Sequence, residues 1–429
     1  MITRKSIIAR KRTLALPHLL GNGLSLGATF AMRWLMNMGF ARLLPAAAFG
    51  TFSIWFSLVN LLTPLFSFGA NLHLLQKSGK ATEQSYRLLA HAFVLLIVGW
   101  LLGMGIMATA WIFGVAIGVV SWALVISIAS LFAANSMFYS FFKGLGDFRI
   151  EARLQLMGGL FLAAFTLGLA AVGGISLVQI ALLVVFCWQL LLFILGARHL
   201  HQRLPVTLHW RDYWPNRQTF LAQLGERSAF GLHEWLSHAY THLSFLLLGM
   251  MVLPAQLATY RSAYLLVIPV GIIPAMVSQV LLQKLSRQAR ITAGERYRFR
   301  QFLQLSFFIG GAVVLFYQIL GVPLADALLG AQYDPLVIAQ LSQWLSVVFG
   351  LQLLSSLYGV LITACGYQAY RVKITLGAIA VQVSGTWIGA QAYGLQGALF
   401  AHLAAVAFIL IGYATFSELK ILKTKSPIC

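Results

Sequence analysis

Long uninterrupted runs of apolar residues constrain this chain more than any other feature. Of its 429 residues, 60% are hydrophobic and only 9% are charged, whereas soluble domains carry roughly 25% charged residues. A run of about 18 or more apolar residues is long enough to cross the hydrocarbon layer of a bilayer as a helix. Because a lipid-embedded segment must satisfy its own backbone hydrogen bonds, these runs indicate helices. The sequence therefore predicts an all-α polytopic membrane protein.

Twelve apolar blocks can be marked, which predicts 12 transmembrane helices. The first half of the chain contains Leu14–Ala41, Gly50–Leu74, Leu88–Ala110, Phe113–Phe141, Leu154–Ala171 and Ile175–Leu195. The second half contains Ser228–Leu248, Ala255–Leu281, Phe302–Leu320, Leu336–Ala364, Ile374–Ala392 and Leu395–Ser417. Equal numbers in the two halves indicate two groups of six helices.

A repeated stretch gives the same division. Leu44–Ala46 returns as Leu253–Ala255, and Leu74–Lys77 returns as Leu281–Lys284, in the same order. A period of half the chain predicts two structurally similar halves. In membrane transporters, such repeats place the substrate site between the halves. We therefore expect two pseudo-repeated six-helix lobes around a central cavity.

The basic residues set the orientation, because Lys and Arg stay on the cytoplasmic side of membranes. With the N-terminus inside, 27 of the 30 basic residues fall in the loops and termini of that side. Both termini are then cytoplasmic. We expect an N-terminal lobe over 1–199, a cytoplasmic interfacial linker over 200–226 and a C-terminal lobe over 227–429. The net charge of +20 does not indicate a nucleic-acid partner, because the basic residues lie between apolar blocks.

Two motifs resemble a known family. ARLLPAAAFGTFSIW, at residues 41–55, places a basic residue and a short link before a Gly-x-aromatic helix start. FKGLGDF, at residues 142–148, follows the fourth apolar block. Both motifs, with the twelve blocks and two lobes, resemble Wzx-type polysaccharide flippases. These belong to the multidrug/oligosaccharidyl-lipid/polysaccharide exporter superfamily.

The resemblance implies a function in surface polysaccharide biosynthesis, such as that of lipopolysaccharide O-antigen. Proteins of this type move an undecaprenyl-diphosphate-linked oligosaccharide from the cytoplasmic to the periplasmic leaflet of the bacterial inner membrane by alternating access. The expected partners are this lipid-linked substrate, the bilayer and other polysaccharide assembly proteins. No enzyme activity and no cofactor are expected.

Three arginines lie outside the cytoplasmic loops: Arg33 within the first block, Arg42 at its outer end, and Arg261 in the eighth block. An arginine at the centre of a bilayer costs about 2.5–3.5 kcal/mol on insertion scales. In the family both spans border the cavity, and guanidinium groups match phosphate oxygens. These three residues are the candidate diphosphate ligands. The alternative is that they extend to the outer headgroups.

The seventh block carries Glu234, His238 and His242. Their spacing of four places all three on one helical face. A Glu–His–His stripe inside a membrane is typical of proton transfer, so we expect an ion-coupling site here. The resemblance implies an acid in the second half of this span, where this chain has Thr241–Phe245 instead. Alternatively, Glu234 lies near the inner interface and pairs with Arg227 or with lipid amines. No metal site is expected.

Pro64 and Pro274 occupy the middle of the two copies of the repeated span. Proline removes a backbone donor and kinks a helix. Both residues are candidate hinges, although a role in packing alone explains them equally well.

Two other functions fit the sequence less well. A multidrug antiporter of the same superfamily would favour acids rather than arginines in its cavity, because many drugs are cations. A membrane polysaccharide polymerase or ligase needs a sizeable outer loop for its chemistry. The outer loops expected here are short, and no nucleophile or metal triad is evident.

Overall fold

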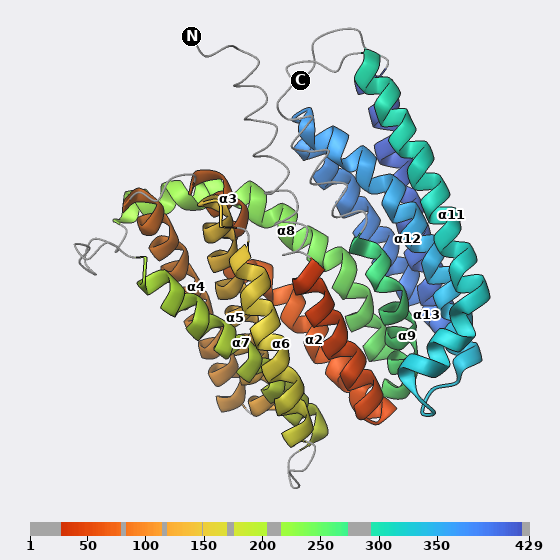
Figure 1. Cartoon of the computed structure of the whole chain (residues 1–429), viewed down its shortest axis with the longest axis horizontal. Coiled ribbons are helices and arrows are strands. Elements are labelled where there is room, and N and C mark those ends of the chain that lie inside the picture. The colour runs from red at the N-terminus through yellow and green to blue at the C-terminus, as the bar shows by residue number, and fades with distance from the viewer. Residues whose placement is uncertain are drawn as a thin grey trace, which may run out of the picture. The chain divides into compact units, whose positions relative to one another are not determined.

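The computed structural model describes residues 27–78, 83–113, 118–147, 149–169, 176–203, 216–272 and 293–422. All regular secondary structure in these ranges is helical (Figure 1). This confirms the predicted all-α class. Pro274 and residues 204–215 of the expected linker lie outside the described residues.

The first half of the chain starts with a helix over 27–43. It is followed by α2 (Ala46–Ser67), α3 (Ala70–Lys77), α4 (Glu83–Ile112), α5 (Val119–Gly144), α6 (Arg149–Leu169) and α7 (Leu177–His201). The second half contains α8 (Arg217–Met251), α9 (Pro254–Val267), the 3₁₀ turn η2 (Ile268–Gly271), α11 (Ala293–Leu329), α12 (Pro335–Ala364), α13 (Gln368–Phe416) and the π-helical turn η3 (Ser417–Leu422).

Seven helices of the described chain are long and apolar enough to cross a membrane: α2, α4, α5, α7, α11, α12 and α13 with η3. The chain is therefore a multi-pass membrane protein, as the apolar blocks predicted. Each of the twelve blocks overlaps a helix of the described residues. The total of twelve spans stays a prediction.

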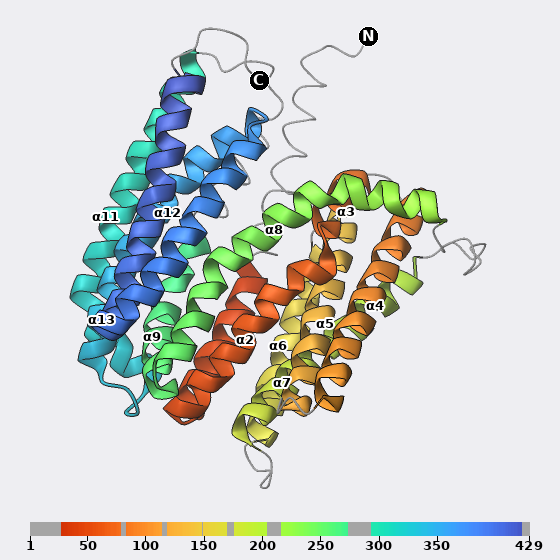
Figure 2. The same ribbon diagram turned by 180° about the vertical axis from the view of Figure 1, so that it is seen from behind.

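The longest of these helices, α13, is in fact a hairpin. Its backbone breaks at Gly394, where φ is 58° and ψ is −131°. Gly397 packs so closely on Gly389 that an added Cβ would lie 1.8 Å from the Gly389 carbonyl oxygen, and Gly385 faces Ala401 in the same way. The two arms are therefore antiparallel (Figure 2). They match the predicted blocks Ile374–Ala392 and Leu395–Ser417.

The chain forms two compact units. The first consists of Met1–Met36 and Trp55–His238, and the second of Asn37–Ile54 and Ala239–Cys429. α2 and α8 each contribute residues to both units. Although α8 begins at Arg217, the expected lobes over 1–199 and 227–429 and the linker over 200–226 stay predictions.

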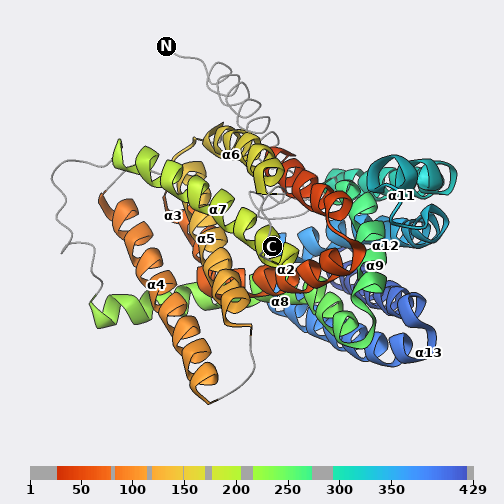
Figure 3. The same cartoon turned by 90° about the horizontal axis from the view of Figure 1, so that it is seen from below.

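In the first unit, α5 packs against α3, α4 and α7 (Figure 3). Its inward face is rich in fully buried aromatic side chains, including Phe141 and Phe142. Phe132 meets the buried Trp188 of α7 edge to face, with ring centroids 6.2 Å apart. Aromatic contacts of this kind add to the burial of apolar area and stabilise the bundle.

In the second unit, α12 packs against α9, α11 and α13. Gly310 of α11 and Gly350 of α12 bring their backbones together, as small residues do at helix contacts in membranes. The two copies of the repeat also meet within this unit. A Cβ on Gly50 would lie 1.8 Å from the carbonyl oxygen of Pro254, so only glycine fits at that position.

Candidate functional site

Arg261 is the most isolated charge among the predicted site residues. Its side chain lies in α9 and is only 4% exposed. Among the described residues, its guanidinium contacts aromatic rings and not a carboxylate. Its Cζ is 4.7 Å from the ring centre of Phe245 and 5.6 Å from that of Tyr264. Its Nε has no hydrogen-bond partner among the described residues. Cation–π contacts hold a guanidinium in place without neutralising it, so Arg261 retains its capacity to bind an anion.

Arg33 has a different environment. The helix over 27–43 places its Cζ 4.6 Å from the ring centre of Phe132. Glu151 of α6 is near enough for its charge to act on the guanidinium. Glu151 also accepts a 2.8 Å hydrogen bond from Thr29 and forms a 2.5 Å ion pair with Lys143. Arg33 is therefore part of a charge network that sequence reasoning missed.

The missed residue is Glu151. It precedes the block Leu154–Ala171, so its position in the sequence suggested a loop. In the structure it lies within the first turn of α6 and is 5% exposed. The position of this carboxyl next to an apolar block could have indicated a buried, paired acid, because unpaired acids near membrane spans are costly.

Arg42 is exposed and lies at the end of another helix. Its Nη1 donates to the carbonyl oxygen of Ala327, at 3.5 Å, in the last turn of α11. A cation at a helix C-terminus interacts favourably with the helix dipole and with the free carbonyls. Next to it, Gln332 hydrogen-bonds to the carbonyl oxygen of Ala41. This geometry gives Arg42 a structural role in addition to its charge.

Glu234, in the predicted coupling stripe, accepts a hydrogen bond from α3, and no cation pairs with it among the described residues. Its Oε1 accepts a 2.9 Å hydrogen bond from the Nδ2 of Asn71. Arg227, the alternative partner, is completely buried and donates to the Oε1 of Gln223 at 3.2 Å and to the Leu88 carbonyl oxygen at 3.5 Å. The expected alternative, in which Glu234 pairs with Arg227, is therefore not seen.

His238 is linked to the backbone at Pro64. Proline has no N–H, so the carbonyl of Asn60, four residues earlier in α2, lacks its usual helical donor. The His238 side chain forms a hydrogen bond with the backbone of Asn60. The Asn60 side chain donates in turn to the Phe56 carbonyl oxygen at 2.7 Å. The structure thus connects a candidate hinge with a candidate coupling residue.

The break in the repeated span comes after Pro64. α2 continues through Pro64 to Ser67, and the chain then turns at Phe68 (φ 39°) and Gly69 (φ 70°) before α3 begins. A Cβ on Gly69 would lie 2.6 Å from both the Arg227 carbonyl oxygen and the Gly231 nitrogen of α8. Glycine is thus required here for conformation and for space. The turn packs closely against α8.

The stripe is divided between the two units. Glu234 and His238 belong to the first, whereas His242, which is half-buried, belongs to the second. In the described residues, no group of three or more His, Cys, Asp and Glu side chains could hold a metal ion.

An ion pair between Glu226 of α8 and Lys77 of α3 also joins these two helices. Lys77 hydrogen-bonds Glu226, and this ammonium holds the pKa of the Glu226 carboxyl below its usual range. Both side chains are about half exposed, so the pair contributes little to stability.

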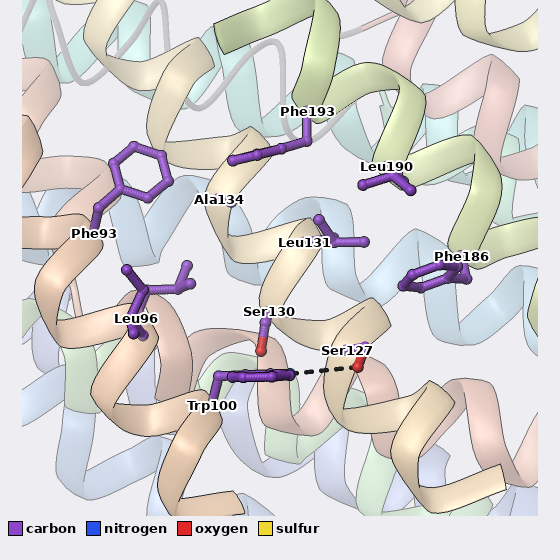
Figure 4. A pocket seen from close by; sticks show the side chains of 11 residues that line it. Phe93, Leu96, Trp100, Ser127, Ser130, Leu131, Ala134, Phe186, Leu190 and Phe193 are labelled. Atoms are coloured by element: carbon purple, nitrogen blue, oxygen red, sulfur yellow. Dashed lines mark hydrogen bonds between the residues drawn. The ribbon is translucent and has the colours of Figure 1, made fainter. Parts of the chain in front are cut away.

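A groove in the first unit is lined almost entirely by apolar side chains (Figure 4). It has a volume of about 320 Å³ and runs between α4 and α7 over α5. Phe93 and Trp100 of α4 face Phe186 and Phe193 of α7. The Trp100 Nε1 donates to the Ser127 Oγ at 3.3 Å. Such a lining suits hydrocarbon and offers nothing to a diphosphate.

Comparison with known structures defines the class of fold. An outward-facing multidrug resistance MATE family transporter of the MOP superfamily aligns over 95% of this chain and 97% of its own, with 16% identity and a TM-score of 0.66. An inward-facing transporter of the same family aligns over 95% and 96%, with 17% identity and a TM-score of 0.66. A MOP superfamily transporter from Pyrococcus furiosus, whose binding pocket is described as reversed in polarity with a suggested different function, aligns over 95% and 96%, with 15% identity and a TM-score of 0.64. The chain therefore has the fold of MOP superfamily transporters.

The sequence identifies the family within that fold. Residues 40–338, more than half of the chain, match the family described as "Polysaccharide biosynthesis protein". The chain belongs to this family, which confirms the resemblance to polysaccharide flippases. No curated protein sequence matches the chain.

Proposed function

We propose that this protein is a flippase that moves an undecaprenyl-diphosphate-linked oligosaccharide from the cytoplasmic to the periplasmic leaflet of the bacterial inner membrane. Membership of the polysaccharide biosynthesis family and the fold of MOP transporters support this function. The observation that carries it is Arg261, a guanidinium buried in the second unit, for which the described residues supply no carboxylate partner. A buried cation of this kind needs an anion, and the substrate would bring two phosphates.

Within this proposal, Arg261 is the principal diphosphate ligand. The rings of Phe245 and Tyr264 stack on its guanidinium and fix its orientation. Because stacking does not consume the guanidinium N–H donors, these can bind phosphate oxygens. Arg33 contributes charge, but Glu151 and Lys143 share its surroundings. Arg42 contributes least, since it already bonds to α11.

The chain would alternate between two states during transport, with both termini cytoplasmic. A one-way cycle needs a driving force, and we assign this role to the α8 stripe. Glu234 and His238 hydrogen-bond to α3 and α2, so a change in their protonation would weaken the contact of α8 with the repeated span. His242 continues the same face. Pro64 and Pro274 would be the hinges that respond.

Export in cells tests the diphosphate site. Arg261→Ala should abolish surface polysaccharide while the protein still inserts, and Arg261→Lys should restore it only in part because the forked donor geometry is lost. Arg298→Ala is the matched control, since this exposed residue lies at the start of α11. Normal polysaccharide from Arg261→Ala would rule out the proposed site.

Vesicles with an imposed pH gradient test the coupling. The flipping rate of the wild type should depend on the gradient, whereas Glu234→Gln should respond less. An equal response of the two proteins would exclude Glu234 from coupling.

A multidrug antiporter is the second candidate, because two of the aligned structures are described as multidrug resistance transporters. Arg261 makes it the weaker one. A cationic drug would be repelled by an unneutralised guanidinium, whereas a diphosphate is attracted. Drug-dependent proton release from vesicles would favour this alternative.

A further inference from the structure

Four buried polar side chains in the second unit have hydrogen-bonding atoms without partners. They are Tyr240 of α8 and Gln382, Thr386 and His402 of α13, and each is at most 8% exposed. Within the part of the chain that the structure describes, no partner is found for the Tyr240 hydroxyl, both polar side-chain atoms of the Gln382 amide, the Thr386 hydroxyl and the His402 Nε2. Buried polar groups in folded proteins are almost always satisfied by protein or by ordered water. Several unsatisfied groups in one region therefore indicate an occupant.

The backbone places three of these residues at one level of the α13 hairpin, and the fourth, Tyr240, contacts one of them. Gln382 and Thr386 are one turn apart on the first arm of α13 and share a face. The antiparallel contact of Gly385 with Ala401 places the neighbouring His402 between them along the hairpin axis. The His402 ring meets the Tyr240 ring edge to face, with centroids 6.0 Å apart. Three helical segments thus contribute polar groups to one buried region.

We infer that Tyr240, Gln382, Thr386 and His402 enclose an internal water site. The set contains both donors and acceptors: the amide and hydroxyl groups can donate, and the amide, hydroxyl and imidazole groups can accept. Water matches such a mixture, and buried waters typically make about three hydrogen bonds. The site links α8 to both arms of the hairpin through the bound water.

Charged occupants fit less well. In the described residues, the side chains close to this site from α9 and the second arm of α13 are also neutral, including Tyr260, Tyr264 and Tyr413. The nearby charge is Arg261, which contacts Tyr264. A metal cation would be buried beside this guanidinium without a carboxylate, which is unfavourable. Neutral water carries no such cost.

The stability of apolar variants of the intact protein tests the inference. Replacing an unsatisfied buried polar group with an apolar one of similar shape is neutral or stabilising, whereas removing a partner of a bound water is destabilising. Thr386→Val and Gln382→Met should therefore each lower the Tm by roughly 2 °C or more. Ser384→Ala, on the exposed face between them, should leave the Tm unchanged. An unchanged or higher Tm for both buried variants would overturn the inference.

Electron cryo-microscopy of the full-length protein provides the second measurement, which does not depend on how the variants fold. A map that resolves waters should show a density within about 3.2 Å of at least three of the unpartnered atoms. It should persist when sodium is replaced by potassium and by choline. An empty site, or a density that follows the cation, would overturn the assignment of water.

Discussion

Glu151→Gln should strongly destabilise the first unit. The side chains of Lys143 and Glu151 are only 14% and 7% exposed, so their ion pair is buried. Breaking a buried pair by removing one partner costs about 3–5 kcal/mol, because a charge is left uncompensated. Here Arg33 loses the same acid. Glutamine keeps an oxygen that can accept the hydrogen bond from Thr29, so the substitution removes mainly the charge.

Equilibrium unfolding in mixed detergent micelles measures this cost. A double-mutant cycle with Lys143→Met isolates the interaction of the pair. The double variant should be more stable than Glu151→Gln alone, because it leaves no unpaired lysine in the network. If Glu151→Gln costs less than about 1 kcal/mol, or if the two effects simply add, the buried ion-pair network does not exist as described.

Three further predictions concern α8 and its neighbours. Gly69→Ala should destabilise the protein by more than Gly146→Ala in denaturant unfolding. Both glycines have positive φ, but only the Gly69 Cβ would meet backbone atoms at 2.6 Å, and equal costs would contradict this. His238→Phe should reduce stability in the wild type but much less in a Pro64→Ala background, because the alanine N–H at position 64 can satisfy the Asn60 carbonyl. Equal losses in the two backgrounds would exclude the hydrogen bond between His238 and the Asn60 backbone. The exposed Lys77–Glu226 pair should add only a small contribution to stability above the usual Glu pKa of about 4.3. This small contribution should be lost as pH falls through the lowered pKa of Glu226, a dependence that Glu226→Gln should abolish in a Tm titration.

The helices were predictable from the sequence because a bilayer places only simple requirements on the length and composition of a membrane span. A span must be apolar and long, and both properties are visible in single blocks. The two blocks on either side of Tyr393 show this, since they became the two arms of the α13 hairpin.

The surroundings of the site residues could not be predicted in the same way. Glu151 near Arg33 and Phe245 beside Arg261 are contacts between different helices, and apolar blocks carry no information on which faces meet. The break after Ser67 was likewise missed. Pro64 suggested a kink, but the turn forms at Phe68 and Gly69, where the close approach of α8 requires glycine.

Flipping of a lipid-linked oligosaccharide by purified protein tests the proposed function most directly. The substrate would carry a fluorescent label on its sugar, be reconstituted into proteoliposomes, and be detected by a sugar-modifying enzyme added outside. We expect wild type and Arg298→Ala to make the inner-leaflet substrate accessible, whereas Arg261→Ala should behave like protein-free vesicles. Equal flipping by wild type and Arg261→Ala, or no flipping above protein-free vesicles by the wild type, would contradict it.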